Sequence, residues 1–263
     1  MSADSILVTT TPRGVATVTL NRPEVHNAFD DATIARLSEV FADLASAEGV
    51  RVVRIEAVGT SFSAGADLNW MRRAADYAEA DNVADAKALG EMLRRLDTLP
   101  MPTVALVQGA AYAGGVGLIA ACDVAVAVKD AMFGVSEVRL GLIPSVILPY
   151  VIGAIGVRAA RRYAASGTRF AAEEARRIGL VHEVVDDAAA LAAAAAAIVE
   201  QFLAAAPGAV AEAKANIRAV AGRPIDDALI DETARRIAVR RTTDEAREGI
   251  AAFLEKRKPS WRD

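Results

Sequence analysis

Short apolar runs and amphipathic stretches alternate through the first part of the chain. Residues 6–10 and 14–20 flank a Pro-Arg-Gly turn, and the second run alternates small or polar with apolar side chains, which predicts a β-hairpin. A helix capped by Asp30 or Asp31 is predicted next, because apolar side chains then recur at helical spacing. They are Ile34, Leu37, Val40, Phe41 and Leu44. Residues 50–58 form the next predicted strand.

The central segment, residues 102–144, follows a plan of strand, glycine-containing turn and helix. An apolar run at residues 103–107 predicts a strand, a glycine-rich turn and a short helix of small residues follow, and residues 124–128 predict another strand. Residues 61–68, SFSAGADL, form a similar turn directly after the strand at 50–58. Such turns leave backbone N–H groups uncovered, so they can bind either a phosphate or a developing oxyanion.

Helices dominate the rest of the chain. Residues 72–97 are charged and alanine-rich and are interpreted as a solvated surface helix, with an element that covers a site as the alternative. Residues 146–167 predict a helical stretch interrupted by proline, and residues 187–206 predict an alanine-rich helix. A capping box, Thr242-x-x-Glu245, is predicted for the last helix.

The order of these elements predicts the fold class and the division of the chain. Strands and helices alternate up to about residue 185, which predicts an α/β protein with mostly parallel pairing. With 263 residues the chain is long enough for a full hydrophobic core. We expect residues 1–205 to form this core. Residues 206–263 show no strand pattern and are expected to form a helical subdomain that docks on the core or on a neighbouring subunit.

Composition narrows the possible functions. A net charge of −4 argues against general affinity for nucleic acid. Cys122 is the only cysteine, which excludes an intramolecular disulfide and fits a reducing compartment. No signal-peptide pattern opens the sequence, so a cytoplasmic location is expected. The apolar stretch at residues 104–122 holds four glycines and divides into strand, turn and helix, so it is not expected to span a membrane.

Neither glycine turn matches a nucleotide-binding motif. A G-x-G-x-x-G motif after the first strand, with an acidic residue near the end of the second, is absent in that order, and a G-x-x-x-x-G-K-[ST] loop is absent altogether. The two turns are therefore interpreted as a pair of N–H donors that converge on one developing negative oxygen. Such a pair is an oxyanion hole.

Ordered motifs along essentially the whole chain resemble the crotonase (enoyl-CoA hydratase/isomerase) superfamily. They are TVTLNRPEVHNAF, SFSAGADL, ALVQGAAYAGGVGL, CDVAVAVKDAMFGVSEVRLGLIP, EEARRIGLVHEVV and FLEKRKPSW. The resemblance implies a spiral of repeated ββα units with a C-terminal helical subdomain, assembly as a homotrimer or dimer of trimers, and an acyl-CoA substrate. Coenzyme A would enter as part of that substrate, and no separate cofactor, metal, nucleic acid or membrane partner is expected.

The resemblance also implies roles for particular residues. The N–H groups of Ala66 and Gly114 would hold the thioester oxygen, and Glu137 would transfer a proton, with a pKa raised by its apolar neighbours. The segments expected to contact the substrate or its coenzyme A moiety contain His26, Asn27, Ala28, Ala64, Gly65, Asp67, Leu68, Gly115 and Gly117. Asp67 and Asp123 are also interpreted as helix caps or salt-bridge partners.

Gly117 departs from the family pattern, because two-glutamate hydratases carry their first glutamate there. Hydration of an α,β-unsaturated acyl-CoA is the preferred function. The alternatives are an enoyl-CoA isomerase with Glu137 as sole acid/base and, from another class, a CoA-ester-binding protein with little catalysis. The stretch SEVRLGLIPSVILPYVIGAIG looks closest to methylglutaconyl-CoA and isohexenylglutaconyl-CoA hydratases, which implies a branched or carboxylated acyl group and a cation in the pocket. Arg72 and Arg139 are candidates by position, although each is more readily interpreted as solvated or structural.

Overall fold

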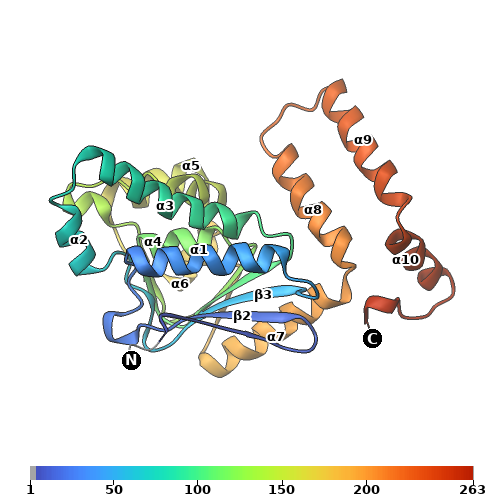
Figure 1. Cartoon of the computed structure of the whole chain (residues 1–263), viewed down its shortest axis with the longest axis horizontal. Coiled ribbons are helices and arrows are strands. Elements are labelled where there is room, and N and C mark those ends of the chain that lie inside the picture. Colours follow the sequence, from blue (N-terminus) through green and yellow to red (C-terminus); the bar gives the residue numbers. More distant parts are fainter. Residues whose placement is uncertain (1–3, 263) are drawn as a thin grey trace.

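A six-stranded sheet is the centre of the computed structural model, which describes residues 4–262 (Figure 1). Its strands lie in the order β1 (Ile6–Thr10), β2 (Val15–Leu20), β3 (Val52–Ala57), β5 (Thr103–Val107), β7 (Val124–Val128) and β10 (Glu183–Val185). β1 and β2 pair antiparallel as the predicted hairpin, and the other pairs in this sheet are parallel. Every residue of β5 is buried, as expected for a strand covered on both faces.

A second sheet has four strands, in the order β4 (Ser61–Ser63), β6 (Ala110–Tyr112), β8 (Met132–Gly134) and β9 (Phe170–Ala171). β4, β6 and β8 are parallel, and β9 pairs antiparallel with β8. Each of the three parallel strands follows a strand of the larger sheet after a short turn and leads into helical structure. This recurrence confirms the predicted α/β class and its ββα units.

Helices cover both faces of the larger sheet. α1 (Asp31–Ser46) and α3 (Glu79–Asp97) pack side by side, and α7 (Ala188–Ala204) packs on the sheet from the other side (Figure 1). α1 begins where predicted, because the Asp30 carboxylate accepts a hydrogen bond from the Thr33 N–H at 2.8 Å. The apolar side chains predicted to share one face of α1 are all buried. The other core helices are α4 (Gly114–Ala120), α5 (Leu148–Ser166) and α6 (Ala172–Ile178).

Two helix predictions are wrong in detail. The charged stretch at residues 72–97 is not one solvated helix, because α2 (Leu68–Ala74) ends inside it and α3 turns apolar side chains into the core. These are Met92, Leu93 and Leu96. Pro149 does not interrupt α5, since it lies in the first turn, where a missing N–H costs no helical hydrogen bond. The break is at Gly156, which has φ 71° and ψ 161°.

The last helix, α10 (Asp244–Leu254), is capped one residue later than predicted. Thr243 Oγ1 accepts a hydrogen bond from the Ala246 N–H at 3.2 Å. Glu245 instead accepts hydrogen bonds of 2.9 and 3.0 Å from N–H groups in the first turn of α8 (Pro207–Val220). The predicted capping box is therefore wrong, because its glutamate stabilises the start of a different helix.

α8, α9 (Asp227–Arg241) and α10 form an arm that extends away from the two sheets (Figure 1). The chain returns to the core at Trp261, whose indole N–H donates to the Ala204 carbonyl at 3.2 Å. Large apolar side chains are exposed on this arm, namely Ile217, Ile225, Ile230, Ile237, Val239, Ile250, Phe253 and Leu254. The division of the chain between residues 205 and 206 stays a prediction.

Within residues 4–262 we find no single helix with the length and apolar character needed to cross a membrane. α7 and α8 meet that requirement only together, as a pair bent by 101°. The apolar stretch at residues 104–122 divides into β5, β6 and α4. The predicted strand and helix are present, but the predicted turn between them contains the short strand β6.

An ion pair with a buried lysine joins the arm to the core. Lys214 on α8 has a side chain that is 9% exposed, and its Nζ lies 2.5 Å from Asp123 Oδ2 and 2.8 Å from the Met101 carbonyl oxygen. The same Asp123 oxygen accepts hydrogen bonds from the N–H and the hydroxyl of Thr103. The predicted salt-bridge role of Asp123 is confirmed, and the pair fixes α8 beside the first residue of β5.

We expect Lys214→Met to lower the free energy of unfolding by about 1–3 kcal/mol, because the hydrogen bonds of the buried ammonium to Asp123 and to the Met101 carbonyl are lost. Lys129→Met is the matched control, since Lys129 forms an exposed ion pair with Asp186 at 3.2 Å and should lose less than about 1 kcal/mol. Chemical denaturation of both variants measures the difference. Equal losses of unfolding free energy in the two variants would show that the Lys214–Asp123 pair contributes no more than an exposed ion pair.

Candidate active site

The pairing of β4 with β6 places the two predicted turns side by side. Ser61 is opposite Ala110 and Ser63 is opposite Ala111, so both strands end at the same edge of the sheet. The contact between the turns is close: a Cβ atom added to Gly65 would lie 3.0 Å from the Ala113 Cβ atom. Gly65 has φ 89°, which also favours glycine.

Ala66 and Gly114 each present a backbone N–H with no hydrogen-bond acceptor among residues 4–262. Phe29 bonds to the residues on either side of Ala66, through Phe29 N–H to the Gly65 carbonyl at 2.6 Å and Asp67 N–H to the Phe29 carbonyl at 2.8 Å. The Ala66 N–H therefore points away from Phe29, as it must in a parallel bridge. Gly114 is the first residue of α4, so its N–H has no acceptor within the helix.

Both turns line one cavity of about 560 Å³. Gly65 and Ala66 come from the first turn and Ala113 and Gly114 from the second, while Glu137 lies in the wall formed by residues 137–147. The rest of the lining is mostly apolar and comes from Phe29, α1, α2 and α3. The structure thus brings together the three residues predicted to carry the chemistry.

Glu137 is the first residue of the 3₁₀ helix η2 (Glu137–Leu140). Its Oε2 atom is buried and has no hydrogen-bond partner among residues 4–262. Burial raises the pKa of Glu137, although backbone N–H groups of Glu137 and Ser136 act in the opposite direction. A carboxyl group in this state is suited to exchanging a proton with a bound molecule.

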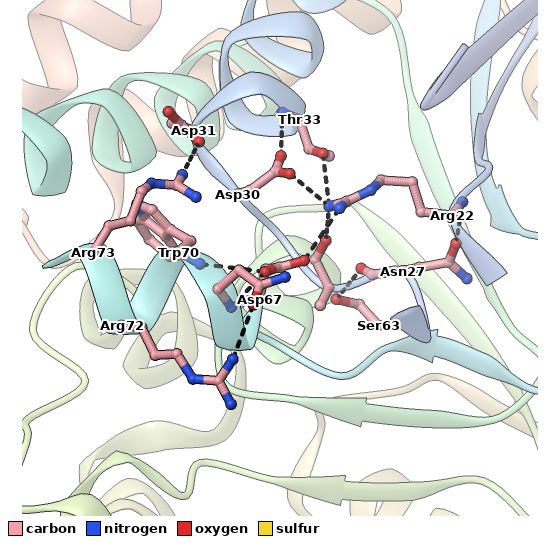
Figure 2. Close-up of polar contacts among 12 residues, drawn as sticks. Arg22, Asn27, Asp30, Asp31, Thr33, Ser63, Asp67, Trp70, Arg72 and Arg73 are labelled. Carbon is pink, nitrogen blue, oxygen red and sulfur yellow. Dashed lines mark hydrogen bonds and ion pairs between the residues drawn. The ribbon is translucent and has the colours of Figure 1, made fainter. Parts of the chain in front are cut away.

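Arg22 holds the loops behind the first turn (Figure 2). Its guanidinium lies 2.9 Å from Asp30 Oδ2 and 3.1 Å from Asp67 Oδ2, and it donates to the Ala28 carbonyl at 2.9 Å. Asp67 in turn caps α2 through the N–H groups of Asn69 and Trp70. Burial opposes ionisation of Asp67, but these hydrogen bonds and Arg22 hold its pKa below the usual range. The predicted cap and salt-bridge role of Asp67 is confirmed.

Of the residues predicted to contact the substrate or coenzyme A, Gly65 lines the cavity, and the others lie outside its lining. Asn27 is buried and donates to the carbonyls of Val58 and Ser61 at 2.8 and 2.9 Å, which joins three loops. His26 and Leu68 are exposed, Ala28 is buried, and the Ala64 N–H donates to the His26 carbonyl at 2.9 Å. Their contact with coenzyme A stays a prediction.

Gly115 and Gly117 are buried against protein. A Cβ atom on Gly115 would lie 2.8 Å from the Ser63 Cβ atom, and one on Gly117 would lie 2.4 Å from Ile147 Cγ2. The position where two-glutamate hydratases carry a carboxylate is therefore closed by an isoleucine side chain. Neither glycine lines the cavity, so the structure gives no support to the prediction that they contact substrate.

Sequence reasoning missed the wall formed by α2 and α3. Trp70, Asn82, Asp85 and Leu89 line the cavity, and the Trp70 indole N–H donates to Asp85 Oδ1 at 3.1 Å. The segment at residues 72–97 thus covers the site, as the rejected alternative held. The helical spacing of Asn82, Asp85 and Leu89 was the available signal, but surrounding charges concealed it. Within residues 4–262, no three His, Cys, Asp or Glu side chains gather as a metal site would require.

Comparison with known proteins agrees with this arrangement. A family model described as Enoyl-CoA hydratase/isomerase matches residues 10–263. The chain is 31% identical over 250 residues to the short-chain-enoyl-CoA hydratase of Clostridium acetobutylicum, covering 93% of this chain and 92% of that protein. It is 30% identical over 263 residues to the 1,2-epoxyphenylacetyl-CoA isomerase of Escherichia coli, covering 95% of each.

A solved structure of an enoyl-CoA hydratase from Shewanella pealeana matches with a TM-score of 0.95 at 41% identity, covering 98% of this chain and 96% of that one. The chain belongs to the enoyl-CoA hydratase/isomerase family, that is, to the crotonase superfamily. The family predicted from the motifs is confirmed. Both hydratase and isomerase names occur among the relatives, so similarity alone does not decide between the two reactions for this chain.

Gly117→Ala should lower the free energy of unfolding by about 1–3 kcal/mol, because the new methyl group meets Ile147. This loss is expected even though alanine favours a helix over glycine by about 1 kcal/mol. Ile147→Ala removes the clashing Cγ2 atom and should recover part of the loss, whereas Ile147→Val keeps the branch and should not. Denaturation of the single and double variants measures the coupling, and a Gly117→Ala protein as stable as the wild type would contradict the close packing.

Glu137→Gln should raise the thermal stability of the protein near neutral pH. Since burial raises the pKa of Glu137 in the folded state, stability falls as pH rises through that pKa. Glutamine removes this loss, so the melting temperature should rise by on the order of 1 °C or more at about pH 7.5. Below the ordinary value of 4.5 the difference should vanish, because both side chains are then neutral.

Melting curves of Glu137→Gln at several pH values check this expectation. Glu24→Gln, which changes an exposed carboxylate on η1 (Pro23–Val25), is the control and should show no such gain. If the rise in melting temperature of Glu137→Gln were unchanged at low pH, the ionisation of Glu137 would not be its cause.

Proposed function

We propose that the protein adds water across the double bond of an α,β-unsaturated acyl-CoA thioester. The observation that carries the proposal is the presence in one cavity of Ala66 and Gly114, whose N–H groups have no acceptor among residues 4–262, and of Glu137, whose Oε2 atom has no hydrogen-bond partner there. Two such donors suit an oxygen that becomes negative, and removing one of them typically costs about 100-fold or more in rate.

The chain's own groups suffice for each step of the addition. A water oxygen bonds to Cβ of the acyl group while Glu137 takes one of its protons, and the electron pair of the double bond moves to the thioester oxygen. Ala66 and Gly114 stabilise this enolate through their N–H groups, aided by the positive end of α4. Collapse of the enolate takes the proton back from Glu137 to Cα. One carboxyl group thus serves first as base and then as acid.

A double-bond shift is the second candidate, and the packing of Ile147 on Gly117 favours it. Hydration by two carboxylates needs a second group to hold water, and that position is closed here. A single carboxylate can instead move a proton between two carbons through the same enolate. The similarity to an isomerase fits this alternative as well. A CoA-ester-binding protein with little catalysis is less well supported, because Glu137 lies in the same cavity as both donors.

The finer expectation of a carboxylated, methylglutaconyl-type acyl group gains no support from the cavity. No lysine or arginine is among its lining residues within the described part of the chain. Arg72 donates to Asn69 at 3.1 Å, and the Arg139 side chain packs against Gly167 at the end of α5. An uncarboxylated acyl group, branched or unbranched, suits this lining better.

Assembly into trimers or dimers of trimers remains part of the proposal. The exposed apolar side chains of α8, α9 and α10 suit burial against other copies of the chain. Arg257, which follows α10, is held by Glu248 at 2.6 Å, so its guanidinium has a structural role.

Glu137→Gln should lower kcat by about 100-fold or more, because glutamine cannot exchange the proton. The dissociation constant for a saturated acyl-CoA should stay within about three-fold of the wild-type value, since the donors of the oxyanion hole are unchanged. Glu24→Gln is the control and should keep wild-type turnover. Undiminished activity in Glu137→Gln would remove Glu137 from the mechanism.

The reaction itself is identified by offering the wild-type protein three esters in parallel: a short 2-enoyl-CoA, a 3-enoyl-CoA and 3-methylglutaconyl-CoA. Loss of the conjugated double bond with gain of water indicates hydration. Conversion of the 3-enoyl to the 2-enoyl ester without water indicates isomerisation. Binding of all three with no turnover would leave the CoA-ester-binding function.

A further inference from the structure

The wall of the cavity formed by α2 and α3 carries polar groups that the proposed chemistry does not use. Asp85 and Asn82 both line the cavity from α3, and Trp70 lines it from α2. Asn27 and Ala28, which are predicted to contact coenzyme A, are outside the lining. The proposed function places the thioester at the two N–H donors, which leaves this wall to the acyl chain.

Every side-chain N–H on this wall is already engaged. The Trp70 indole N–H donates to Asp85 Oδ1 at 3.1 Å. Asn82 Nδ2 donates to the carbonyls of Tyr77 and Ala78 at 3.2 and 3.3 Å, which ties down the start of α3. What remains are Asp85 Oδ2 and Asn82 Oδ1, which have no hydrogen-bond donor among residues 4–262. Both are acceptors.

The charge of Asp85 is not neutralised by a close cation. Arg73 is near enough to favour the ionised form of Asp85, but its guanidinium is paired with Asp31 at 2.7 Å. Burial has the largest effect on the pKa of Asp85 and raises it. The nearby Asp31 carboxylate also raises this pKa, whereas the hydrogen bond from Trp70 lowers it. A second anion brought to this wall would meet a carboxylate with no free positive partner.

We propose that this acceptor-only wall makes Asp85 a specificity residue, which favours an acyl chain bearing a hydroxyl group and disfavours one bearing a carboxylate. The inference rests on the proposed function, because it takes the cavity to hold the acyl group of a CoA ester. A hydroxyl hydrogen can be donated to Asp85 Oδ2, whereas a carboxylate has no hydrogen to donate and repels it. An acyl chain with a terminal methyl group should bind with an affinity between those of the hydroxyl and carboxylate chains.

The test compares saturated acyl-CoA esters that end in methyl, hydroxyl or carboxylate, at each of several equal chain lengths. Saturated esters cannot react, so their dissociation constants, measured by calorimetry, report the wall alone. At the chain length that reaches Asp85, the hydroxyl ester should bind about ten-fold more tightly than the methyl ester. The carboxylate ester should bind about ten-fold more weakly.

Two variants separate the contribution of Asp85 from that of the rest of the wall. Asp85→Leu should make the hydroxyl and methyl esters equal. Asp85→Asn, which keeps the shape and an acceptor for Trp70 but adds N–H donors, should recover about ten-fold in binding of the carboxylate ester. Asp76→Asn removes an exposed carboxylate between α2 and α3 and should leave all ratios unchanged. Binding of the methyl ester checks that each variant is folded.

A wild-type protein that binds the carboxylate ester as tightly as the methyl ester would overturn the proposal, and so would ratios that are the same in Asp85→Leu and the wild type. The matching 2-enoyl esters are assayed separately for turnover. If the binding ratios hold and no ester reacts, the proposed function fails while the specificity stands. If the 2-enoyl esters react but the three saturated esters bind with equal dissociation constants, the specificity fails while the proposed function stands.

Discussion

The parallel pairing of β4 with β6 brings two backbone turns into van der Waals contact, and the rest of the site depends on that contact. Gly65 meets Ala113, and Gly115 meets Ser63, at distances that leave no room for a Cβ atom. Because the turns touch, Ala66 and Gly114, whose N–H groups have no acceptor among residues 4–262, line the same cavity. Gly65 and Gly115 are needed because each lies against atoms of the other turn. The close approach of the two strands then brings the two N–H donors near each other.

Phe29 and Arg22 make this arrangement rigid. The Phe29 backbone forms a parallel bridge to Ala66, and a Cβ atom on Gly114 would lie 3.0 Å from the Phe29 ring. Arg22 then ties the Phe29 loop to the caps of α1 and α2 through Asp30 and Asp67 (Figure 2). A donor pair that is held in place before substrate arrives need not reorganise during the reaction, which is the source of its catalytic value.

The sequence was sufficient for features set by local chemistry. The hairpin, the buried strand at residues 103–107 and the Asp30 cap follow from alternation, apolar runs and capping preference. It was insufficient where a side chain's partner is distant along the chain. Glu245 matches a capping box but binds α8, and Asp85 sits in a charged stretch but faces Trp70 across the link between α2 and α3. The closure of Gly117 by Ile147 could not be predicted from spacing either, because Gly117 lies in α4 and Ile147 lies 30 residues later, just before α5.

Donors and acceptors that lack a partner among residues 4–262 come from different parts of the cavity. The donors belong to the backbone of the two turns, and the acceptors belong to the side chains of Glu137, Asp85 and Asn82. A thioester carbonyl can therefore form hydrogen bonds at only one end of the cavity. In the proposed reaction, a thioester bound there would have its α-carbon at the same position whatever the acyl chain. Glu137 would serve hydration and a double-bond shift alike through the same enolate, so the choice between the two reactions would depend on whether water has access to the β-carbon.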